Sequence, residues 1–136
     1  MMKQQQAELE IFKRIGQFTA VDKDNLRIEN QPTRDGMPFK PPSNQPWCRV
    51  HVNYGDSGIA SIGNSPDIRD YGFISIQCFA PLNTGTITVA AMCDEWRELL
   101  QSYTVSHLEI YKVHAPRSIE DKDFYAKIIR AEFRVN

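Results

Sequence analysis

The sequence has neither a long hydrophobic run nor an excess of charge of one sign. No apolar stretch approaches the roughly 20 residues of a transmembrane helix, and the polar residues 1–6 do not provide the apolar core of a signal peptide. Sixteen basic residues against 17 acidic ones give a formal net charge of -1, which argues against the strong positive field of a nucleic-acid binder. These absences favour a protein made and kept in the cytoplasm, or in a particle assembled there.

Cysteine is also scarce. The three cysteines, Cys48, Cys78 and Cys93, form no CxxC pair, and each lies in a stretch of periodic apolar residues. We therefore expect three reduced thiols in the core. A chain of 136 residues can bury one core without disulfides or metals, and 41% hydrophobic and 24% charged residues are ordinary for a globular protein. The expected organisation is a single domain over residues 1–136.

Motifs for catalysis and metal binding are absent as well. There is no P-loop, no Gly-x-Ser-x-Gly elbow and no HExxH pattern. The histidines His51, His107 and His114 lie apart on predicted strands, where solvated or hydrogen-bonded side chains are more common than metal ligands. Residues 55–58 spell the surroundings of a serine-protease nucleophile, but the chain before Ser57 is too short for the barrel that would carry the other catalytic residues. We predict no catalytic, cofactor-binding or metal site.

Two segments have the apolar spacing of amphipathic helices. The first ends near Gly16 or Gln17, and the second follows the possible capping residues 83–86. The apolar stripe of the first comprises Ile11, Phe12, Ile15 and Phe18. That of the second comprises Val89, Met92, Cys93, Trp96, Leu99, Leu100 and Tyr103.

Alternating apolar and polar residues predict strands at 47–54, 71–80, 106–114 and 124–135. In the last of these, Arg130, Glu132 and Arg134 are expected to face outwards. The turn signal at 55–58 predicts a hairpin with a short return strand at 59–62, followed by a loop over 63–70. Together these elements predict an α+β domain in which two helices pack on one face of a mainly antiparallel sheet.

Prolines concentrate between residues 30 and 46, and their density excludes both a helix and a central strand there. They are Pro32, Pro38, Pro41, Pro42 and Pro46. A connection of this length without regular structure is usually functional or flexible. We expect an extended Pro-rich arm.

Nucleic-acid binding has one weak candidate, the outward arginines Arg130 and Arg134 with Lys127 nearby. Glu132 lies between the two arginines, which favours a polar surface that faces solvent or a neighbouring subunit. In an assembly, these side chains would select the pairing of subunits by charge complementarity.

The order of these features resembles the tail terminator proteins of long-tailed bacteriophages over about the first three-quarters of the chain. The matching residues are a helix ending at 16–18, then Phe39, Pro41, Pro42, Trp47, Arg49, Val50, Gly55, Ser57, Gly58, Arg69, Tyr71, Gly72, the run 76–81, and Gly85. Cys48 and Cys78 depart from the pattern, although both can fill core positions.

The resemblance implies a virion subunit that assembles in the host cytoplasm as a homohexameric ring and caps the tail tube. Such a ring stops tube polymerisation and offers the surface that joins the head. The implied partners are other copies of the chain, the major tail tube protein, and a head-completion or connector protein, with no membrane, cofactor or sequence-specific nucleic acid. Catalysis is not required.

Two surfaces follow as hypotheses. The subunit interface would comprise Phe39, Pro41, Pro42, Trp47, Arg130 and Arg134. Contacts with the tube or its lumen would comprise Asp56, Ser57 and Arg69. The alternatives are another minor tail or head-tail connector subunit, a small ligand-binding or hydrolytic domain with a deep pocket, and a nucleic-acid module.

Overall fold

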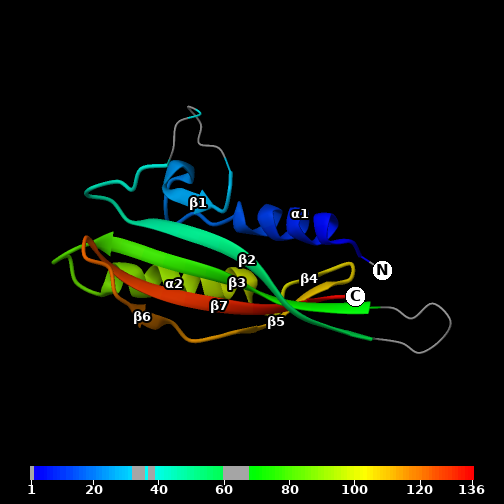
Figure 1. Cartoon of the computed structure of the whole chain (residues 1–136). Coiled ribbons are helices and arrows are strands. Elements are labelled where there is room, and N and C mark those ends of the chain that lie inside the picture. The colour runs from blue at the N-terminus through cyan, green and yellow to red at the C-terminus, as the bar shows by residue number, and fades with distance from the viewer. Residues whose placement is uncertain (1, 32–35, 37–38, 60–67) are drawn as a thin grey trace.

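The computed structural model describes residues 2–31, 36, 39–59 and 68–136. In chain order the elements are α1 (Gln4–Ile15), a 3-10 turn (Lys23–Asn25), β1 (Leu26–Ile28), β2 (Trp47–Ile59), β3 (Ile68–Pro81), α2 (Ile87–Leu100), β4 (Thr104–Val105), β5 (Leu108–Val113), β6 (Arg117–Ile119) and β7 (Phe124–Val135). Figure 1 shows the long strands β2, β3 and β7 side by side.

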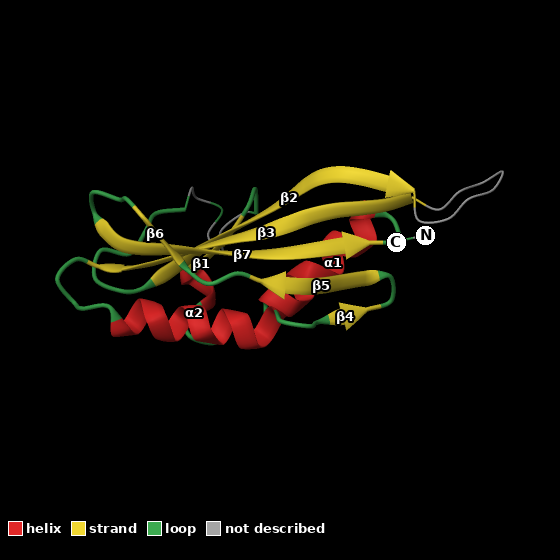
Figure 2. Ribbon diagram, turned by 90° about the horizontal axis from the view of Figure 1, so that it is seen from below, coloured by secondary structure: helices red, strands yellow, loops and turns green. Residues whose placement is uncertain are grey.

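The described strands form one sheet in the order β1-β2-β3-β7-β5-β4, with β6 paired to β7 beside β5. Every pairing is antiparallel except that of β1 with β2. Both helices lie on the same side of this sheet (Figure 2). The predicted α+β architecture, with two helices on one face of a mainly antiparallel sheet, is therefore confirmed.

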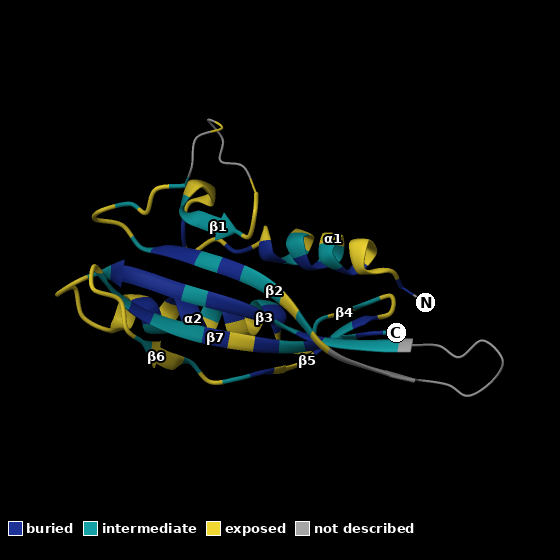
Figure 3. Ribbon diagram, in the orientation of Figure 1, coloured by how far each residue is buried: buried dark blue, intermediate teal, exposed yellow. Residues whose placement is uncertain are grey.

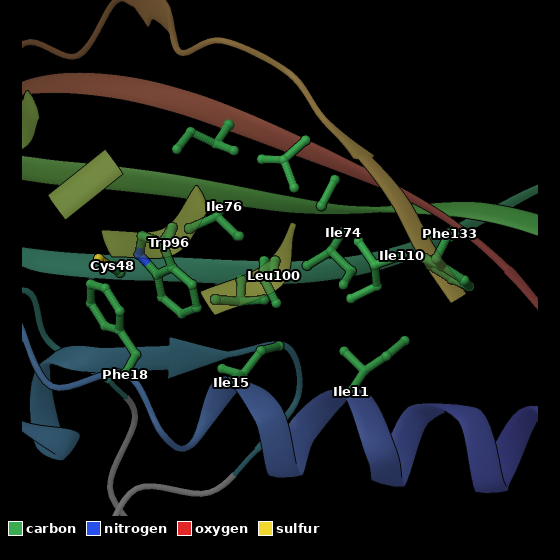
Figure 4. Close-up of a cluster of buried hydrophobic side chains, with 14 of the residues drawn as sticks. Ile11, Ile15, Phe18, Cys48, Ile74, Ile76, Trp96, Leu100, Ile110 and Phe133 are labelled. Atoms are coloured by element: carbon green, nitrogen blue, oxygen red, sulfur yellow. The ribbon is translucent and has the colours of Figure 1, made fainter. Parts of the chain in front are cut away.

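The core lies between the helices and the inner face of the sheet. Side chains alternate between the two faces of a strand, so Cys48 and Val50 of β2 and Ile74 and Ile76 of β3 point inwards and are fully buried. Figure 3 shows this alternation along part of β2, whereas most of β3, at the centre of the sheet, is buried on both faces. Figure 4 shows where the helices meet the strands. The helix side chains drawn there include Ile11, Ile15, Trp96 and Leu100.

Both predicted helices are present, with one difference at the start of α2. Thr86 occupies the cap position but makes no side-chain hydrogen bond to the helix. The Thr84 hydroxyl instead donates to the carbonyl oxygen of Pro81 at 2.7 Å, which closes the turn between β3 and α2. The helices are joined by Arg14, whose Nε donates to the carbonyl oxygen of Leu99 at 2.8 Å.

The predicted turn at 55–58 is wrong. β2 continues through these residues to Ile59, and the ladder with β3 shifts register between Tyr54 and Ser57. The shift is a β-bulge, and pairing with a long neighbour outweighs the local turn propensity. The predicted return strand and most of the predicted loop fall on residues 60–67, outside the described residues, while residues 68–70 are strand rather than loop. The short strands β1, β4 and β6 were not predicted.

The Tyr54 side chain on the inner face predicts an alkaline loss of stability. Its ring packs edge-on against Phe133, with centroids 5.6 Å apart, and its buried hydroxyl has no hydrogen-bond partner among the residues described. Burial raises the pKa of Tyr54 to about 12, and the carboxylates of Glu8 and Asp70 add to this rise.

The folded state therefore holds the Tyr54 proton more tightly than the unfolded state, whose tyrosine pKa is about 10. The associated stability is complete below pH 10 and is lost as the pH rises towards 12. We expect the free energy of unfolding of the wild type to fall more steeply than that of Tyr54→Phe across this range, measured as urea midpoints at several pH values. Parallel curves would contradict this prediction.

Candidate interaction surface

The side of the sheet opposite the helices, which we call the outer face, is covered by no helix in the described part of the chain (Figure 2). Register and strand alternation define its members. They are Trp47, Arg49, His51 and Asn53 of β2; Tyr71, Phe73, Ser75, Gln77 and Phe79 of β3; Phe124, Ala126, Ile128, Arg130, Glu132 and Arg134 of β7; Glu109 and Lys112 of β5; and Arg117 and Ile119 of β6. The predicted outward direction of Arg130, Glu132 and Arg134 is confirmed.

One end of the outer face is closed by aromatic side chains. Trp47 stacks on Phe79 with ring centroids 4.0 Å apart, and Phe124 meets its edge at 5.6 Å. Phe39 of the arm packs over Trp47 at 5.4 Å. The arm therefore folds back on its own chain at this point, and Trp47 is only 4% exposed.

This arrangement bears on the predicted interface residues of the arm. Pro41 is exposed and Pro42 is half-buried, whereas Trp47 is covered by Phe39. In this conformation a neighbouring subunit would meet Pro41 before it met Trp47. The arm residues 32–35 and 37–38 lie outside the described residues.

At the opposite end of the outer face, the charged side chains are paired with one another. Arg134 bonds Glu109 through Nε at 3.0 Å and through Nη2 at 2.8 Å, and its guanidinium lies 5.2 Å from the Tyr111 ring centroid. His114 Nε2 lies 3.0 Å from a carboxylate oxygen of Glu132. These pairs are partly exposed, so each stabilises the fold only weakly. Their main effect is to leave Arg134 engaged within its own subunit.

The middle of the outer face differs, because its arginines have no carboxylate partner among the described side chains. Arg49 donates to the amide oxygen of Gln77 at 2.9 Å. The Arg130 guanidinium lies 4.1 Å above the Phe73 ring, and Arg117 makes no ion pair. Both border a cleft of about 350 Å³. The cleft is lined by His114, Ala115, Pro116, Arg117, Ile128 and Arg130. This is a basic cleft with a partly apolar lining.

The outer face as a whole is positive. Its basic residues are Arg49, Lys112, Arg117, Arg130, Arg134 and, opposite Arg49 on β1, Arg27; its acidic residues are Glu109, Glu132 and, 3.8 Å from His51, Glu29. The formal charge of these side chains is therefore positive by three, whereas the whole chain carries -1. The remainder of the chain must carry the acidic excess. A surface with this charge separation is suited to an acidic partner.

The ends of β2 and β3 form a two-stranded ribbon that continues past the rest of the sheet (Figure 1). The pairing of β3 with β7 begins at Asp70. The two residues of β3 before it, Ile68 and Arg69, pair with β2 but not with β7. The Arg69 guanidinium donates to the side-chain oxygen of Asn136, which fixes the base of the ribbon. The predicted contact residues Asp56 and Ser57 lie within β2 rather than at a hairpin tip, and their side chains lie outside the description.

The three cysteines are buried, free thiols, as expected. Cys48 and Cys78 face each other across β2 and β3, with sulfurs 3.8 Å apart, and Cys93 of α2 is 1% exposed. Hydrogen bonds with Cys48 and Cys93, together with burial, raise the pKa of the Cys78 thiol well above its usual range. A buried, protonated thiol is a poor nucleophile. The hydrogen bond with Cys78 lowers the pKa of the Cys93 thiol, but Cys93 is buried between α2 and the sheet, so reagents do not reach it.

The described residues have neither a cluster of metal ligands nor a helix that could span a membrane. No group of three or more His, Cys, Asp or Glu side chains is placed to hold a metal ion. No helix in residues 2–31, 36, 39–59 and 68–136 is long and apolar enough to cross a membrane.

Sequence reasoning missed Arg117, Lys112 and Glu109 as members of the outer face. Arg117 lies in a strand of three residues, which is too short to show alternation. Lys112 follows a register shift between β5 and β7, so its face could not be read from spacing. The sequence did contain the alternation that places Arg130 and Arg134 together.

No protein-family model and no curated protein sequence matches the chain. Seven solved chains match it in structure. One of them, whose name states no function, superposes with a TM-score of 0.73 at 13% identity, over 100% of this chain and 97% of its own. At this identity the likeness establishes a shared fold alone. The shared fold extends over nearly the whole length of that chain.

Proposed function

We propose that this chain is a structural subunit of a long-tailed phage that acts as a tail terminator. In this role it assembles as a homohexameric ring on the last ring of the tail tube, stops tube polymerisation and provides the surface that joins the head. The observation that supports the proposal best is the open, basic outer face opposite a layer of two helices. The order of sequence features that resembles terminators points the same way.

A ring has a specific physical requirement. Each subunit must offer one patch to its neighbour and a different patch in return, and the rotation between subunits must close. A subunit with a basic sheet face on one side and helices on the other has two unlike surfaces on opposite sides (Figure 2). Neither surface needs to perform catalysis in this role.

The ribbon formed by β2 and β3 and the Pro-rich arm have roles in the same proposal. The ribbon extends beyond the sheet, with Arg69 at its base. In the proposed ring it would contact the tube or line its lumen. The arm, held to its own subunit by Phe39, presents Pro41 to a neighbour. Its partners would be other copies of this chain, the major tail tube protein and a head-completion or connector protein.

The proposal is tested with purified tail tubes. Light scattering over a concentration series, with and without tubes, should show a six-subunit species or uptake of the chain onto tubes, and negative-stain images should show it at one tube end only. Protein that remains monomeric and ignores tubes at every concentration would refute the proposal. Binding to a head connector but not to tubes would instead identify the chain as a head-tail joining subunit.

A further inference from the structure

We propose that the basic cleft of the outer face binds the acidic, solvent-facing side of α2 from a second copy of this chain, with Arg117 and Arg130 receiving Asp94 and Glu98. The inference rests on the proposed function, because it names the two unlike surfaces through which neighbouring ring subunits would meet. The two arginines and the two carboxylates lie on opposite sides of one subunit, so they can meet only between two copies of the chain.

The acidic side of the contact lies on the exposed surface of α2. Asp94 and Glu98 are both exposed, and neither has a hydrogen bond or ion pair to another described residue. They are four residues apart, so they lie on the same face of the helix. The nearby charged residues are engaged elsewhere, since Glu95 accepts a hydrogen bond from Thr19 and Arg97 donates to the carbonyl oxygen of Val113. The charged residues of α2 are three acids, Asp94, Glu95 and Glu98, against one base, Arg97, so its exposed side keeps a net negative charge.

The basic side of the contact is complementary in spacing. Arg117 pairs with Ile128 across β6 and β7, and Arg130 follows Ile128 on the same face, so the two arginines are diagonal neighbours. Diagonal neighbours in a sheet are about 7–8 Å apart, while side chains at i and i+4 on a helix are about 5–6 Å apart. The length and flexibility of arginine cover this difference. Each guanidinium can then meet one carboxylate, with up to two hydrogen bonds per pair.

Other acidic groups of the chain are weaker partners for this cleft. Glu10 lies 3.5 Å from the ammonium of Lys13, and Asp121 accepts the backbone N–H groups of Asp123 and Phe124. Within the outer face, Glu109 and Glu132 are held by Arg134 and His114. The carboxylates of Asp22, Glu120 and Asp123 also make no ion pair with a described residue, but none of them lies on a regular helix or strand face. Asp94 and Glu98 form an uncommitted pair of acids on one helix face.

The position of the two surfaces determines the kind of assembly. The cleft lies on the outer face, and α2 lies beneath the inner face (Figure 2). A contact that joins opposite sides of identical subunits is heterologous, so each added subunit leaves the same two surfaces free until the chain of subunits closes. This is the behaviour that a terminator ring requires.

A protein partner fits the outer face better than single-stranded nucleic acid. Nucleic-acid platforms stack bases on open aromatic rings, whereas here guanidiniums cover Phe73 at 4.1 Å and Tyr111 at 5.2 Å. Trp47 and Phe79 are buried against each other. Nucleic acid is nevertheless included as an outcome of the test.

Charge reversal provides the experiment. The face variant carries Arg117→Glu and Arg130→Glu, and the helix variant carries Asp94→Lys and Glu98→Lys. Each variant alone would oppose like charges at every contact, so its self-association and its uptake onto tube ends should weaken at least about tenfold. An equal mixture should assemble again, because the acidic helix of the face variant meets the basic face of the helix variant, and the reciprocal contact is also between opposite charges.

The mixture also controls for folding, since misfolded variants would not recover when combined. A matched control reverses two exposed lysines that belong neither to the arm nor to α2, β6 or β7, Lys3→Glu and Lys23→Glu, and should assemble like the wild type. Light scattering and tube uptake are measured for each sample.

The failures of the two proposals are distinguishable. If the wild type caps tubes but both variants do so equally well, or if the mixture fails to recover, the inference is overturned and the terminator role stands. A wild type that never associates, with or without tubes, overturns both. Salt-dependent binding of a fluorescent single-stranded oligonucleotide that the face variant loses, while its self-association is unchanged, would overturn the inference in favour of nucleic acid.

Discussion

Replacing Trp96 with alanine should lower the free energy of unfolding by about 3–5 kcal/mol, as is typical for a buried tryptophan. Trp96 is completely buried at the centre of α2, and its ring stacks on Phe18 with centroids 3.9 Å apart and planes 12° from parallel. Figure 4 shows this pair between the helices and the sheet. The truncation would leave a cavity beneath β2 and β3 and would separate the segment after α1 from α2.

The loss is large relative to the roughly 5–15 kcal/mol that separates a folded domain from its unfolded state. Trp96 Nε1 has no hydrogen-bond partner within the described residues, so the truncation leaves no other polar group without its partner. The expected loss of stability therefore comes from packing alone. Urea denaturation followed by circular dichroism provides the measurement. The control is Ile87→Ala in the same helix: its side chain is 78% exposed, so we expect a change within about 0.5 kcal/mol. Equal losses in the two variants would contradict the packing argument.

The second large effect is expected at Gly72, where even a methyl group has no space. A Cβ at this position would lie 2.4 Å from the carbonyl oxygen of Asn53 and 2.6 Å from Cζ of Phe133. The first of these atoms belongs to the backbone of β2, so the conflict cannot be relieved by a side-chain rotation. We expect Gly72→Ala to destabilise the protein by about 3 kcal/mol, at the upper end of overpacking effects.

Gly55 provides the matched control on the facing strand. A Cβ there would lie 3.7 Å from the carbonyl oxygen of Tyr71, an ordinary contact. Gly55→Ala should therefore leave stability unchanged or raise it slightly, because alanine restricts the unfolded chain. Both variants are compared by thermal and urea denaturation. A Gly72→Ala protein as stable as the Gly55→Ala protein would show that β2 and β3 can separate at this point without cost.

The crowding at Gly72 has a consequence for the proposed assembly. Tyr54, Gly72 and Phe133 are consecutive partners across β2, β3 and β7, and the missing side chain allows the two rings to meet edge to face. This contact lies where the sheet narrows towards the ribbon. A Gly72→Ala protein that folds at low temperature should therefore be impaired in tube binding if the ribbon is a contact element.

The sequence predicted the elements in which one periodicity continues long enough to outweigh local signals. β3, β7 and α2 were anticipated because each repeats its apolar spacing over ten or more residues, and α1 because its shorter stripe is followed by a glycine that ends it. The turn predicted at 55–58 failed because Gly55 and Gly58 have high turn propensity, and only the partner strand reveals that they belong to a ladder. Strands of two or three residues carry no periodic signal at all, so β1, β4 and β6 were missed.

The sequence alone determined the α+β fold class, the burial of the three cysteines and the outward direction of Arg130 and Arg134, because burial of apolar stripes depends on local spacing. Only the tertiary structure decided which distant residues share the outer face. Pairing of β6 with β7 places Arg117 beside Arg130 on the outer face. Pairing of β5 with β7 places Glu109 where it forms an ion pair with Arg134. Charge complementarity is a property of a surface, and a surface is assembled from segments whose register the chain order does not contain. The separation of a basic sheet face from an acidic helix therefore emerged only when the strands were paired.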